Sequence, residues 1–256
     1  MTILRRLLTK VVASRFLAVS LALVFSCTTS PSCAQPPNFD DYNTLLGNLT
    51  AQLGNLKAQL VAYHDSGDYM RELAAVDARA RQYLDSHVAG VKKPALVLDI
   101  DETSLSNWPE IKADVFLFVE DGPCSVPPSG TPSRPCGALA WDARAKSPPI
   151  PPTVALFNDA KARGVAVFFV TGRHNTEREA TERNLLFAGY HGWTALFMED
   201  GKRSFVSAAD FKAPARQSIE AEGYHIIVNV GDQPSDLEGG AADQGFQLPN
   251  PFYRIP

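Results

Sequence analysis

The chain has 256 residues, of which 45% are hydrophobic and 20% charged, with a formal net charge of -4 and a pI near 5.7. This balance is typical of a globular protein and excludes collagenous, disordered and multi-pass membrane classes. The sequence has no dense run of lysine and arginine, so binding to a nucleic-acid polymer through phosphate neutralisation has no electrostatic support.

The first 34 residues have the features of an export signal. Four basic residues precede an apolar run at residues 16–25. That run is shorter than the about 20 residues that a membrane-spanning helix needs, but it has the length of a signal-peptide core. The basic residues are Arg5, Arg6, Lys10 and Arg15.

Two processing sites fit this segment. Small residues before Gln35 favour cleavage after Ala34, which makes residues 1–34 a signal peptide. Cys27 offers a lipid anchor instead, although the large Phe25 weakens that motif, and an uncleaved anchor is the third alternative. We therefore expect a protein that is exported, periplasmic or secreted, with no membrane span in its mature form.

Residues 35–90 are predicted to form an N-terminal helical extension. Two apolar stripes at helical spacing are separated by a break at Ser66 and Gly67, and the second helix covers roughly 67–88. The pattern predicts a helical hairpin packed on the main domain. A dimerisation surface, and hence a homodimer, is the alternative. The first stripe consists of Leu46, Leu49, Leu53, Leu56, Leu60 and Tyr63.

The remaining residues, 91–256, change to an α/β pattern. Apolar runs of strand length alternate with helical segments, which predicts a doubly wound parallel sheet covered on both faces. Ligands of such sheets bind beyond the carboxyl ends of the strands. The predicted strands are 95–98, 165–170, 225–230 and, with a weaker pattern, 195–198, and the helices lie near 152–162, 175–188 and 211–222.

Polar residues suited to one chemistry follow three of these strands. A single Asp-x-Asp after an apolar run is common, but three matching strand ends in one order rarely arise by chance. The first strand is followed by Asp99, Asp101 and Thr103, the second by Thr171, Gly172 and Arg173, and the last by Asp232 and Asp236.

These elements resemble motifs I to IV of the haloacid dehalogenase (HAD) superfamily. Within it they are similar to the subfamily IIIB acid phosphatases, especially the plant-type acid phosphatase and vegetative storage protein group. The resemblance runs from about residue 40 to the end and departs at Pro234, where a tryptophan is usual. It rests on DxDxT at 99–103, TGR at 171–173, Lys212, GDxxxD at 231–236, and the segments 182–190, 229–237 and 248–256.

The resemblance implies phosphoryl transfer on a HAD-like core with a cap. Asp99 would be the nucleophile that forms an aspartyl-phosphate. Asp101 would protonate the leaving alcohol and then activate water. Lys212 would neutralise Asp99 and the transferred group, because a phosphate ester repels anionic nucleophiles unless its charge is balanced. A solvated helix lysine is the alternative for this residue.

Two carboxylates so close in sequence also call for a cation. Mg²⁺ fits because it prefers oxygen ligands. The resemblance implies ligands from the Asp99 carboxylate, the Asp101 backbone carbonyl and Asp232, with Asp236 behind them through water. A polar turn after a strand is the structural alternative for Asp232 and Asp236.

The TGR segment is expected to bind the phosphoryl group. Thr171 would donate its hydroxyl, and Gly172 would let the backbone approach closely. Capping of the following helix is the alternative for Thr171. Arg173 has two equal readings, a phosphate ligand or a brace for the acidic cluster.

Residues 104–150 form the expected cap insertion. Its aromatic residues fit either stacking on an aromatic leaving group or a small satellite core, which we favour. Cys124 and Cys136 bracket a stretch rich in proline and serine, which predicts a disulfide in an exported protein, with two free thiols as the alternative. The aromatic residues are Trp108, Phe116, Phe118 and Trp141.

The sequence therefore favours an acid phosphatase that hydrolyses small phosphomonoesters. A storage or interaction protein with negligible turnover is the alternative from another class. The retention of Asp99, Asp101, Lys212 and Asp232 disfavours it. A phosphotransferase would use the same residues, so the sequence does not separate it from a hydrolase. Dehalogenation is disfavoured because it has no need for the acid that Asp101 supplies.

Overall fold

The computed structural model describes residues 39–127, 132, 134–201 and 207–255, with side chains from residue 42 onward. The chain divides into two compact units, residues 1–52 and 53–256. The export signal predicted at residues 1–34 lies outside the described residues. In the described part of the chain, no helix combines the length and apolar character needed to cross a membrane.

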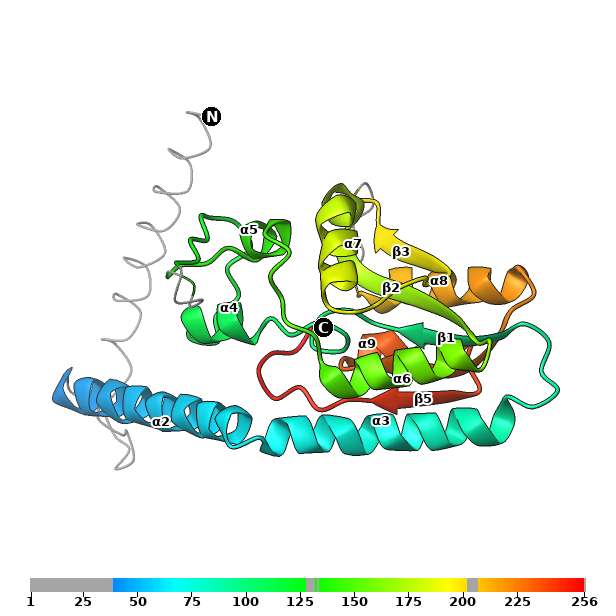
Figure 1. Cartoon of the computed structure of the whole chain (residues 1–256). Helices are drawn as coiled ribbons and strands as arrows, with labels where there is room; N and C mark the ends of the chain where they lie inside the picture. The colour runs from blue at the N-terminus through cyan, green and yellow to red at the C-terminus, as the bar shows by residue number, and fades with distance from the viewer. Residues whose placement is uncertain (1–38, 128–131, 133, 202–206, 256) are drawn as a thin grey trace, which may run out of the picture. The chain divides into compact units, whose positions relative to one another are not determined.

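Helices and strands alternate along the second unit (Figure 1). The strands are β1 (Pro94–Leu98), β2 (Ala166–His174), β3 (Ala195–Glu199), β4 (His225–Gly231) and β5 (Gln244–Gln247). The helices are α3 (Asp68–His87), α4 (Trp108–Ala113), α5 (Ala138–Ala143), α6 (Pro151–Ala162), α7 (Arg178–Phe187), α8 (Ala209–Ala221) and α9 (Pro234–Leu237), with a 3₁₀ turn at Asn175–Glu177. Helix α2 (Phe39–Asp65) runs through the boundary between the two units.

The five strands form one parallel sheet in the order β3-β2-β1-β4-β5. This confirms the predicted α/β fold with a doubly wound parallel sheet. The central position of β1 between β2 and β4 matters for function, because it brings three polar strand ends together. Strand β5 was not predicted, since its sequence is polar and it lies half-exposed at the edge of the sheet.

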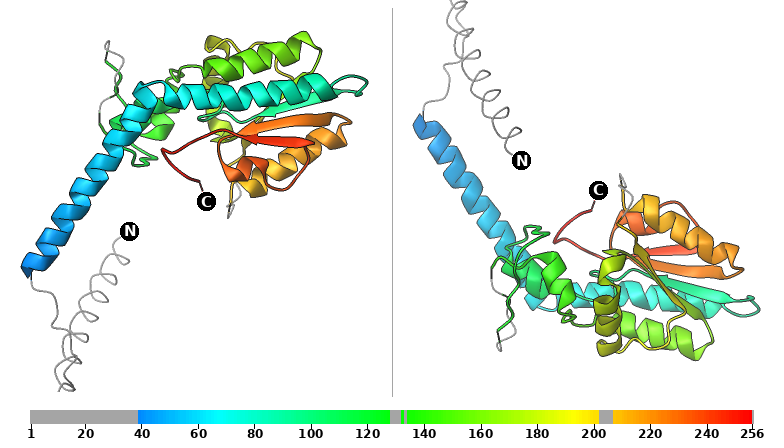
Figure 2. Two further views of the ribbon diagram at one scale, coloured as in Figure 1. Left: turned by 90° about the horizontal axis from the view of Figure 1, so that it is seen from below. Right: turned by 90° about the horizontal axis from the view of Figure 1, so that it is seen from above.

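Strand β1 is buried on both faces because its alternate side chains enter two separate apolar clusters. Leu96 and Leu98 join a cluster that includes side chains of α3 and α6. Ala95 and Val97 point the other way, into a cluster with Ala215 and other residues of α8. Figures 1 and 2 show these helices on opposite sides of the sheet. The continuous apolar run in β1 therefore reflects burial on two faces.

The N-terminal helices differ from the expected hairpin. Residues 53–65 of α2 lead into α3 through a bend and do not fold back along it (Figures 1 and 2). Gly67 at this bend has φ 81°, a left-handed conformation that glycine adopts without strain. Much of the apolar stripe of α2 is exposed, namely Leu46 and Leu49 in the first unit and Leu53 and Leu56 in the second.

Helix α3 belongs to the core of the second unit. Leu73, Ala80 and Leu84 are fully buried in the same cluster as Leu96 of β1. The helix packs beside α6 on one face of the sheet. Removal of its buried face would therefore uncover β4 and β5 on that side.

We predict that Leu73→Ala lowers the free energy of unfolding by about 2–5 kcal/mol, because it leaves a cavity in the core. Leu56→Ala makes the same chemical change at a half-exposed position of the second unit, so it should cost less than about 1 kcal/mol. Urea denaturation monitored by circular dichroism measures both. Equal effects of the two substitutions would contradict the assignment of α3 to the core.

Candidate active site

The three polar strand ends meet at one edge of the sheet. Asp99 follows β1, the segment Thr171–Arg173 ends β2, and Asp232 follows β4. Because β2 and β4 flank β1 in parallel, their carboxyl ends lie on either side of Asp99. Helix α8 brings Lys212 to the same place.

Lys212 is the centre of a buried ion cluster. Its ammonium Nζ donates to Asp99 Oδ1 at 2.6 Å and also to Asp236 Oδ1. Carboxylate oxygens of Asp99, Asp232 and Asp236 lie within 4.8 Å of one another, and all three residues are buried. One lysine thus pairs with two of the three buried carboxyl groups, and the third, Asp232, lies beside them.

The cluster shifts the ionisation of its members. Burial and the neighbouring Asp236 raise the pKa of Asp99, against the opposing effect of Lys212. Burial and Asp236 likewise raise the pKa of Asp232, to about 7. Burial alone would lower the pKa of Lys212, but Asp99 and Asp236 outweigh it and raise that pKa. Lys212 is therefore firmly cationic.

The donor set fits a hard divalent cation. Asp99, Asp232 and Asp236 offer carboxylate oxygens only, which are the ligands that Mg²⁺ prefers. A single ammonium leaves a cluster of three carboxylates short of positive charge. A cation beside Asp99 and Asp232 would remove that deficit.

Asp232 is fixed by residues from distant parts of the chain. Its Oδ2 accepts hydrogen bonds from Asn250 Nδ2 at 2.7 Å and from Gln233 Nε2 at 2.5 Å. Its Oδ1 accepts from the Thr103 hydroxyl at 3.2 Å. Asn250 lies in the C-terminal segment that follows β5. The orientation of Asp232 thus depends on Asn250 in the segment after β5 and on Thr103 in the loop after β1.

Gly231 explains the first position of the GDxxxD motif. A Cβ at this residue would overlap the Cβ and the carboxyl group of Asp236. The side chain of Asp236 therefore folds across the Gly231 backbone, where only glycine leaves room. Gln233 N donates to the other carboxylate oxygen of Asp236 at 2.8 Å. These contacts aim Asp236 at Lys212.

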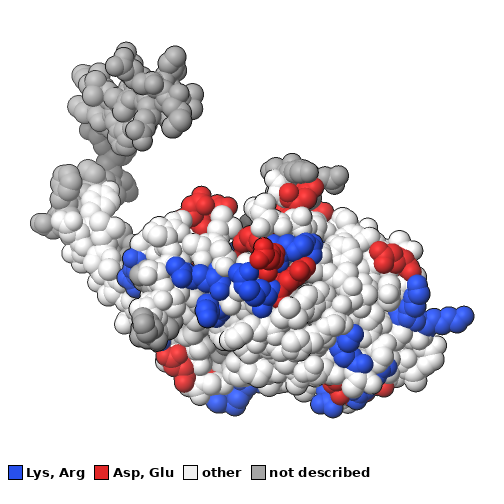
Figure 3. Space-filling model, turned by 45° about the horizontal axis from the view of Figure 1, so that its top comes forward, with Lys and Arg blue, Asp and Glu red and all other residues white. Residues whose placement is uncertain are grey.

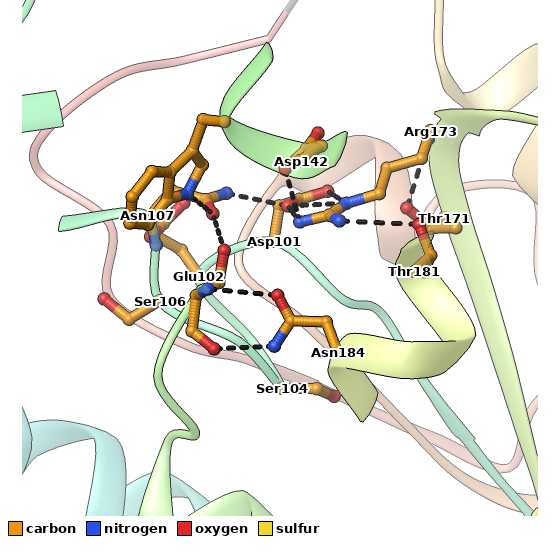
Figure 4. A network of polar contacts seen from close by, with 12 residues as sticks. Asp101, Glu102, Ser104, Ser106, Asn107, Asp142, Thr171, Arg173, Thr181 and Asn184 are labelled. Carbon is orange, nitrogen blue, oxygen red and sulfur yellow. Dashed lines mark hydrogen bonds and ion pairs between the residues drawn. The ribbon is translucent and has the colours of Figure 1, made fainter. Parts of the chain in front are cut away.

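Asp101 lies in a second polar network (Figure 4). Arg173 Nε donates to both of its carboxylate oxygens, at 3.0 and 3.1 Å, and Nη2 donates to Oδ1 at 2.6 Å. Asn107 Nδ2 also donates to Oδ1, at 2.7 Å. Arg173 Nη2 contacts Asp142 of the cap at 2.9 Å. Burial would raise the pKa of Asp101, but Arg173 and Asn107 outweigh it and lower that pKa.

The cap holds Asn107 in turn. Asn107 Oδ1 accepts from Trp141 Nε1 at 3.0 Å and from the Ser147 hydroxyl at 2.8 Å. Trp141 packs with Cys124 and Cys136, which form a disulfide. The small buried cluster of Cys124, Cys136 and Trp141 is thus connected to Asp101 by the hydrogen bonds of Asn107.

The TGR segment combines one buried and one open position. Thr171 is fully buried, and its Oγ1 accepts from the Arg173 backbone N–H at 3.1 Å, which leaves the hydroxyl proton free to be donated. Gly172 is exposed, and apart from Gly172 itself and its two chain neighbours, no described residue has an atom within 4 Å of the place that a Cβ would take. The open space beside Gly172 suits a group that approaches the backbone.

The structure thus brings Asp99, Asp232 and Asp236 together in one cluster with the ammonium group of Lys212. The Asp101 carboxylate is paired separately with Arg173, a contact that the brace reading of Arg173 requires. Sequence reasoning did not identify the polar contacts of Asn107, Asp142 and Asn250. The segment 248–256 carried part of the family resemblance, which is the one signal that pointed to Asn250.

One face of the molecule carries both signs of charge (Figure 3). Figure 3 shows lysine and arginine atoms next to aspartate and glutamate atoms on this face, in separate small groups. The visible face therefore presents a mixed field rather than a continuous basic surface.

Comparison with known proteins agrees with this arrangement. The sequence profile of the HAD superfamily, subfamily IIIB (acid phosphatase), matches residues 44–256. Acid phosphatase 1 of Solanum lycopersicum is 30% identical over 194 residues, which cover 73% of this chain and 69% of that protein. The Stem 28 kDa glycoprotein of Glycine max is 36% identical over 118 residues, 45% of this chain and 46% of that protein.

A solved structure shares the fold. The class C acid phosphatase from Bacillus anthracis superposes with a TM-score of 0.62 at 21% identity, over 79% of this chain and 86% of that one. The profile match spans the sheet, the ion cluster, the cap and the C-terminal segment. The chain therefore belongs to subfamily IIIB of the HAD superfamily, the acid phosphatases.

Proposed function

We propose that this acid phosphatase is exported, depends on Mg²⁺, and hydrolyses small phosphomonoesters through an aspartyl-phosphate on Asp99. The observation that carries the proposal is the position of Asp99. Its carboxylate lies at the end of the central strand, 2.6 Å from Lys212 Nζ, within a buried cluster of three carboxyl groups. Such a group is oriented, desolvated and beside a fixed cation, as a nucleophile for an anionic ester must be.

In the first half of the reaction a carboxylate oxygen of Asp99 attacks phosphorus. The bond from phosphorus to the ester oxygen breaks, and the leaving alcohol takes a proton from Asp101. Lys212 stays paired with Asp99 and balances the charge of the transferred group. Arg173 and Asn107 hold the Asp101 carboxyl in place for this transfer. Because they also lower its pKa, Asp101 must take up a proton before the alcohol leaves, which favours reaction in acid.

In the second half a water molecule attacks phosphorus of the aspartyl-phosphate. Asp101, now a carboxylate, takes a proton from that water, and the bond between phosphorus and the Asp99 oxygen breaks. Inorganic phosphate leaves and Asp99 is regenerated. The spare hydroxyl proton of Thr171 and the open backbone at Gly172 are suited to bind phosphoryl oxygens throughout.

Asp99, Asp232 and Asp236 would hold the metal ion, with the Asp101 backbone carbonyl as a further ligand. When bound, Mg²⁺ supplies Lewis-acid neutralisation of the phosphoryl charge. Thr103, Gln233 and Asn250 keep Asp232 oriented as a ligand.

A storage protein without turnover is the second candidate. Vegetative storage protein 1 of Arabidopsis thaliana is 27% identical over 162 residues, 62% of this chain. The complete Asp99–Lys212–Asp236 cluster favours catalysis, because storage alone has no use for three buried carboxyl groups around one cation. Measured turnover separates the two candidates.

We predict that the wild-type protein releases phosphate from p-nitrophenyl phosphate, that chelation with EDTA abolishes this release, and that added Mg²⁺ restores it. Asp99→Asn should lower kcat by at least about 10³-fold, because it removes the nucleophile. Asp121→Asn makes the same change on the exposed surface and serves as the matched control. Equal turnover of Asp99→Asn and wild type would rule out this mechanism.

We predict that Arg173→Lys impairs alkyl phosphates more than aryl phosphates. Loss of the arginine fork misplaces Asp101, whose proton an alkoxide needs and p-nitrophenolate does not. We expect kcat for an alkyl ester to fall by about 10²-fold and kcat for p-nitrophenyl phosphate to fall by less than about 10-fold. If instead KM rose equally for both esters with kcat unchanged, Arg173 would be a phosphate ligand.

We predict that the exported protein begins at Gln35 and contains a Cys124–Cys136 disulfide. Intact-mass spectrometry without reductant, on protein recovered from outside the cytoplasm, measures both features. A lipid-modified chain that starts at Cys27 would show that the protein is anchored by a lipid and is not cleaved after Ala34. Recovery of the whole chain only from the cytoplasm would refute export.

A further inference from the structure

A buried carboxyl group outside the catalytic cluster is linked to it by hydroxyl groups. Asp77 lies on α3 with 3% of its surface exposed. Its Oδ2 is 2.9 Å from the hydroxyl oxygen of Thr153 on α6. Helices α3 and α6 lie side by side on one face of the sheet (Figures 1 and 2). The mechanism proposed above makes no use of this residue.

Thr153 faces two acceptors with one proton. Its Oγ1 lies 2.7 Å from the backbone carbonyl oxygen of Thr103 and 2.9 Å from Asp77 Oδ2. A hydroxyl donates one hydrogen bond, so it cannot donate to both oxygens at once. Both contacts are hydrogen bonds only if Asp77 carries a proton and donates it to Thr153, while Thr153 donates to Thr103.

The surroundings of Asp77 favour that protonated form. Its other oxygen, Oδ1, is buried and has no hydrogen-bond partner among the described residues. The groups that act on it are a hydroxyl, Thr153, and the phenol of Tyr190, which donates to Ser104 O. Arg81, on the same helix, is paired with Asp159 of α6 instead. A buried carboxylate without a cation is costly, so burial raises the pKa of Asp77 to about 7.

The chain of donors ends at a proposed metal ligand. Thr103, whose carbonyl receives the Thr153 proton, uses its own hydroxyl to hold Asp232 Oδ1 at 3.2 Å. The hydrogen bonds therefore run from α3 through α6 and the loop after β1 to the end of β4. A protonated Asp77 donates to Thr153 and Thr153 donates to the Thr103 carbonyl, whereas the separate hydroxyl of Thr103 donates to Asp232. The proton on Asp77 therefore sets the first two bonds and acts on Asp232 only through the position of Thr103.

We propose that Asp77, by keeping its proton, is a positioning residue that fixes the Thr103 peptide and through it the orientation of Asp232. When Asp77 ionises, its carboxylate is a stronger acceptor than the Thr103 carbonyl, so the Thr153 hydroxyl turns and donates its hydrogen bond to Asp77 instead. The Thr103 carbonyl then loses its donor, and the loop that bears Asp101 and Thr103 loses one of its anchors. Thr103 and Asp232 are thus held firmly in position at acid pH and less firmly above neutral pH.

The first test needs no catalysis. Difference infrared spectra between wild type and Asp77→Asn, recorded on the full chain, should show a protonated carboxyl band at pH 5.5 that disappears near pH 7. Asp85→Asn, on the same helix but exposed and paired with Arg163 in the wild type, is the matched control and should leave the Asp77 band in place. A carboxylate signal from Asp77 at pH 5.5 would overturn the proposal.

Thermal unfolding gives a second readout that is independent of turnover. The pKa of Asp77 is raised from about 3.9 in the unfolded chain to about 7 in the fold. Its contribution to stability is therefore fully present below about pH 4 and is lost as the pH rises through about 7. Relative to Asp77→Asn, which cannot ionise, wild type should lose several degrees in Tm between pH 4 and pH 8. A constant difference in Tm would contradict the proposal.

The third readout rests on the proposed phosphatase function and tests positioning. With saturating substrate, the apparent Mg²⁺ affinity of wild type should fall several-fold more between pH 5.5 and pH 8 than that of Asp77→Asn. Thr153→Ser, which keeps the hydroxyl, should follow wild type, and Thr153→Val should be weakened at every pH. Equal pH dependence in wild type and Asp77→Asn would refute positioning. Absence of turnover in wild type would refute the proposed function alone, since the first two readouts would stand.

Discussion

The pairing of Lys212 with Asp99 and Asp236 is the interaction on which the site depends. It joins α8, the end of β1 and the turn after β4 at one buried point, so three parts of the chain must be placed correctly for any of them to function. Removing the ammonium would leave carboxyl groups buried without a partner, which is more costly than the pairing itself is favourable. The cluster is therefore weak evidence that these residues stabilise the fold. It is strong evidence that the site needs buried charges for its chemistry.

Much of this arrangement could be predicted from the sequence, for a physical reason. Residues 95–98 are apolar without alternation because β1 is buried on both faces, and that pattern also fixes where Asp99 emerges. The edge strand β5 escaped prediction because a half-exposed strand needs no apolar run. The expected hairpin failed because a stripe at helical spacing identifies an apolar face but does not say what covers it; α3 uses its face, whereas Leu53 and Leu56 of α2 stay exposed.

The side chains that orient the site were harder to anticipate. Asn107, Asp142 and Asn250 are single polar residues in loops or short helices, and no periodicity marks them. Their roles come from contacts across long sequence separations, such as Asn250 with Asp232 or Asp142 with Arg173. The sequence left two readings of Arg173 open, and its three bonds to the Asp101 carboxylate favour the brace, which the Arg173→Lys experiment tests. The candidate reactive residues at the strand ends can thus be identified from the sequence. The residues that orient them are identified only from the folded structure.

The hydrogen bond from Asn250 to Asp232 has a consequence for how the molecule comes into being. During synthesis, the strand that carries Asp99 leaves the ribosome more than a hundred residues before Asn250 does. Until then Asp232 lacks one of the donors to its Oδ2, so the site is complete only after Asn250 has been synthesised and has reached Asp232. A nascent chain that does not yet include Asn250 would accordingly contain the reactive groups without yet containing the finished site.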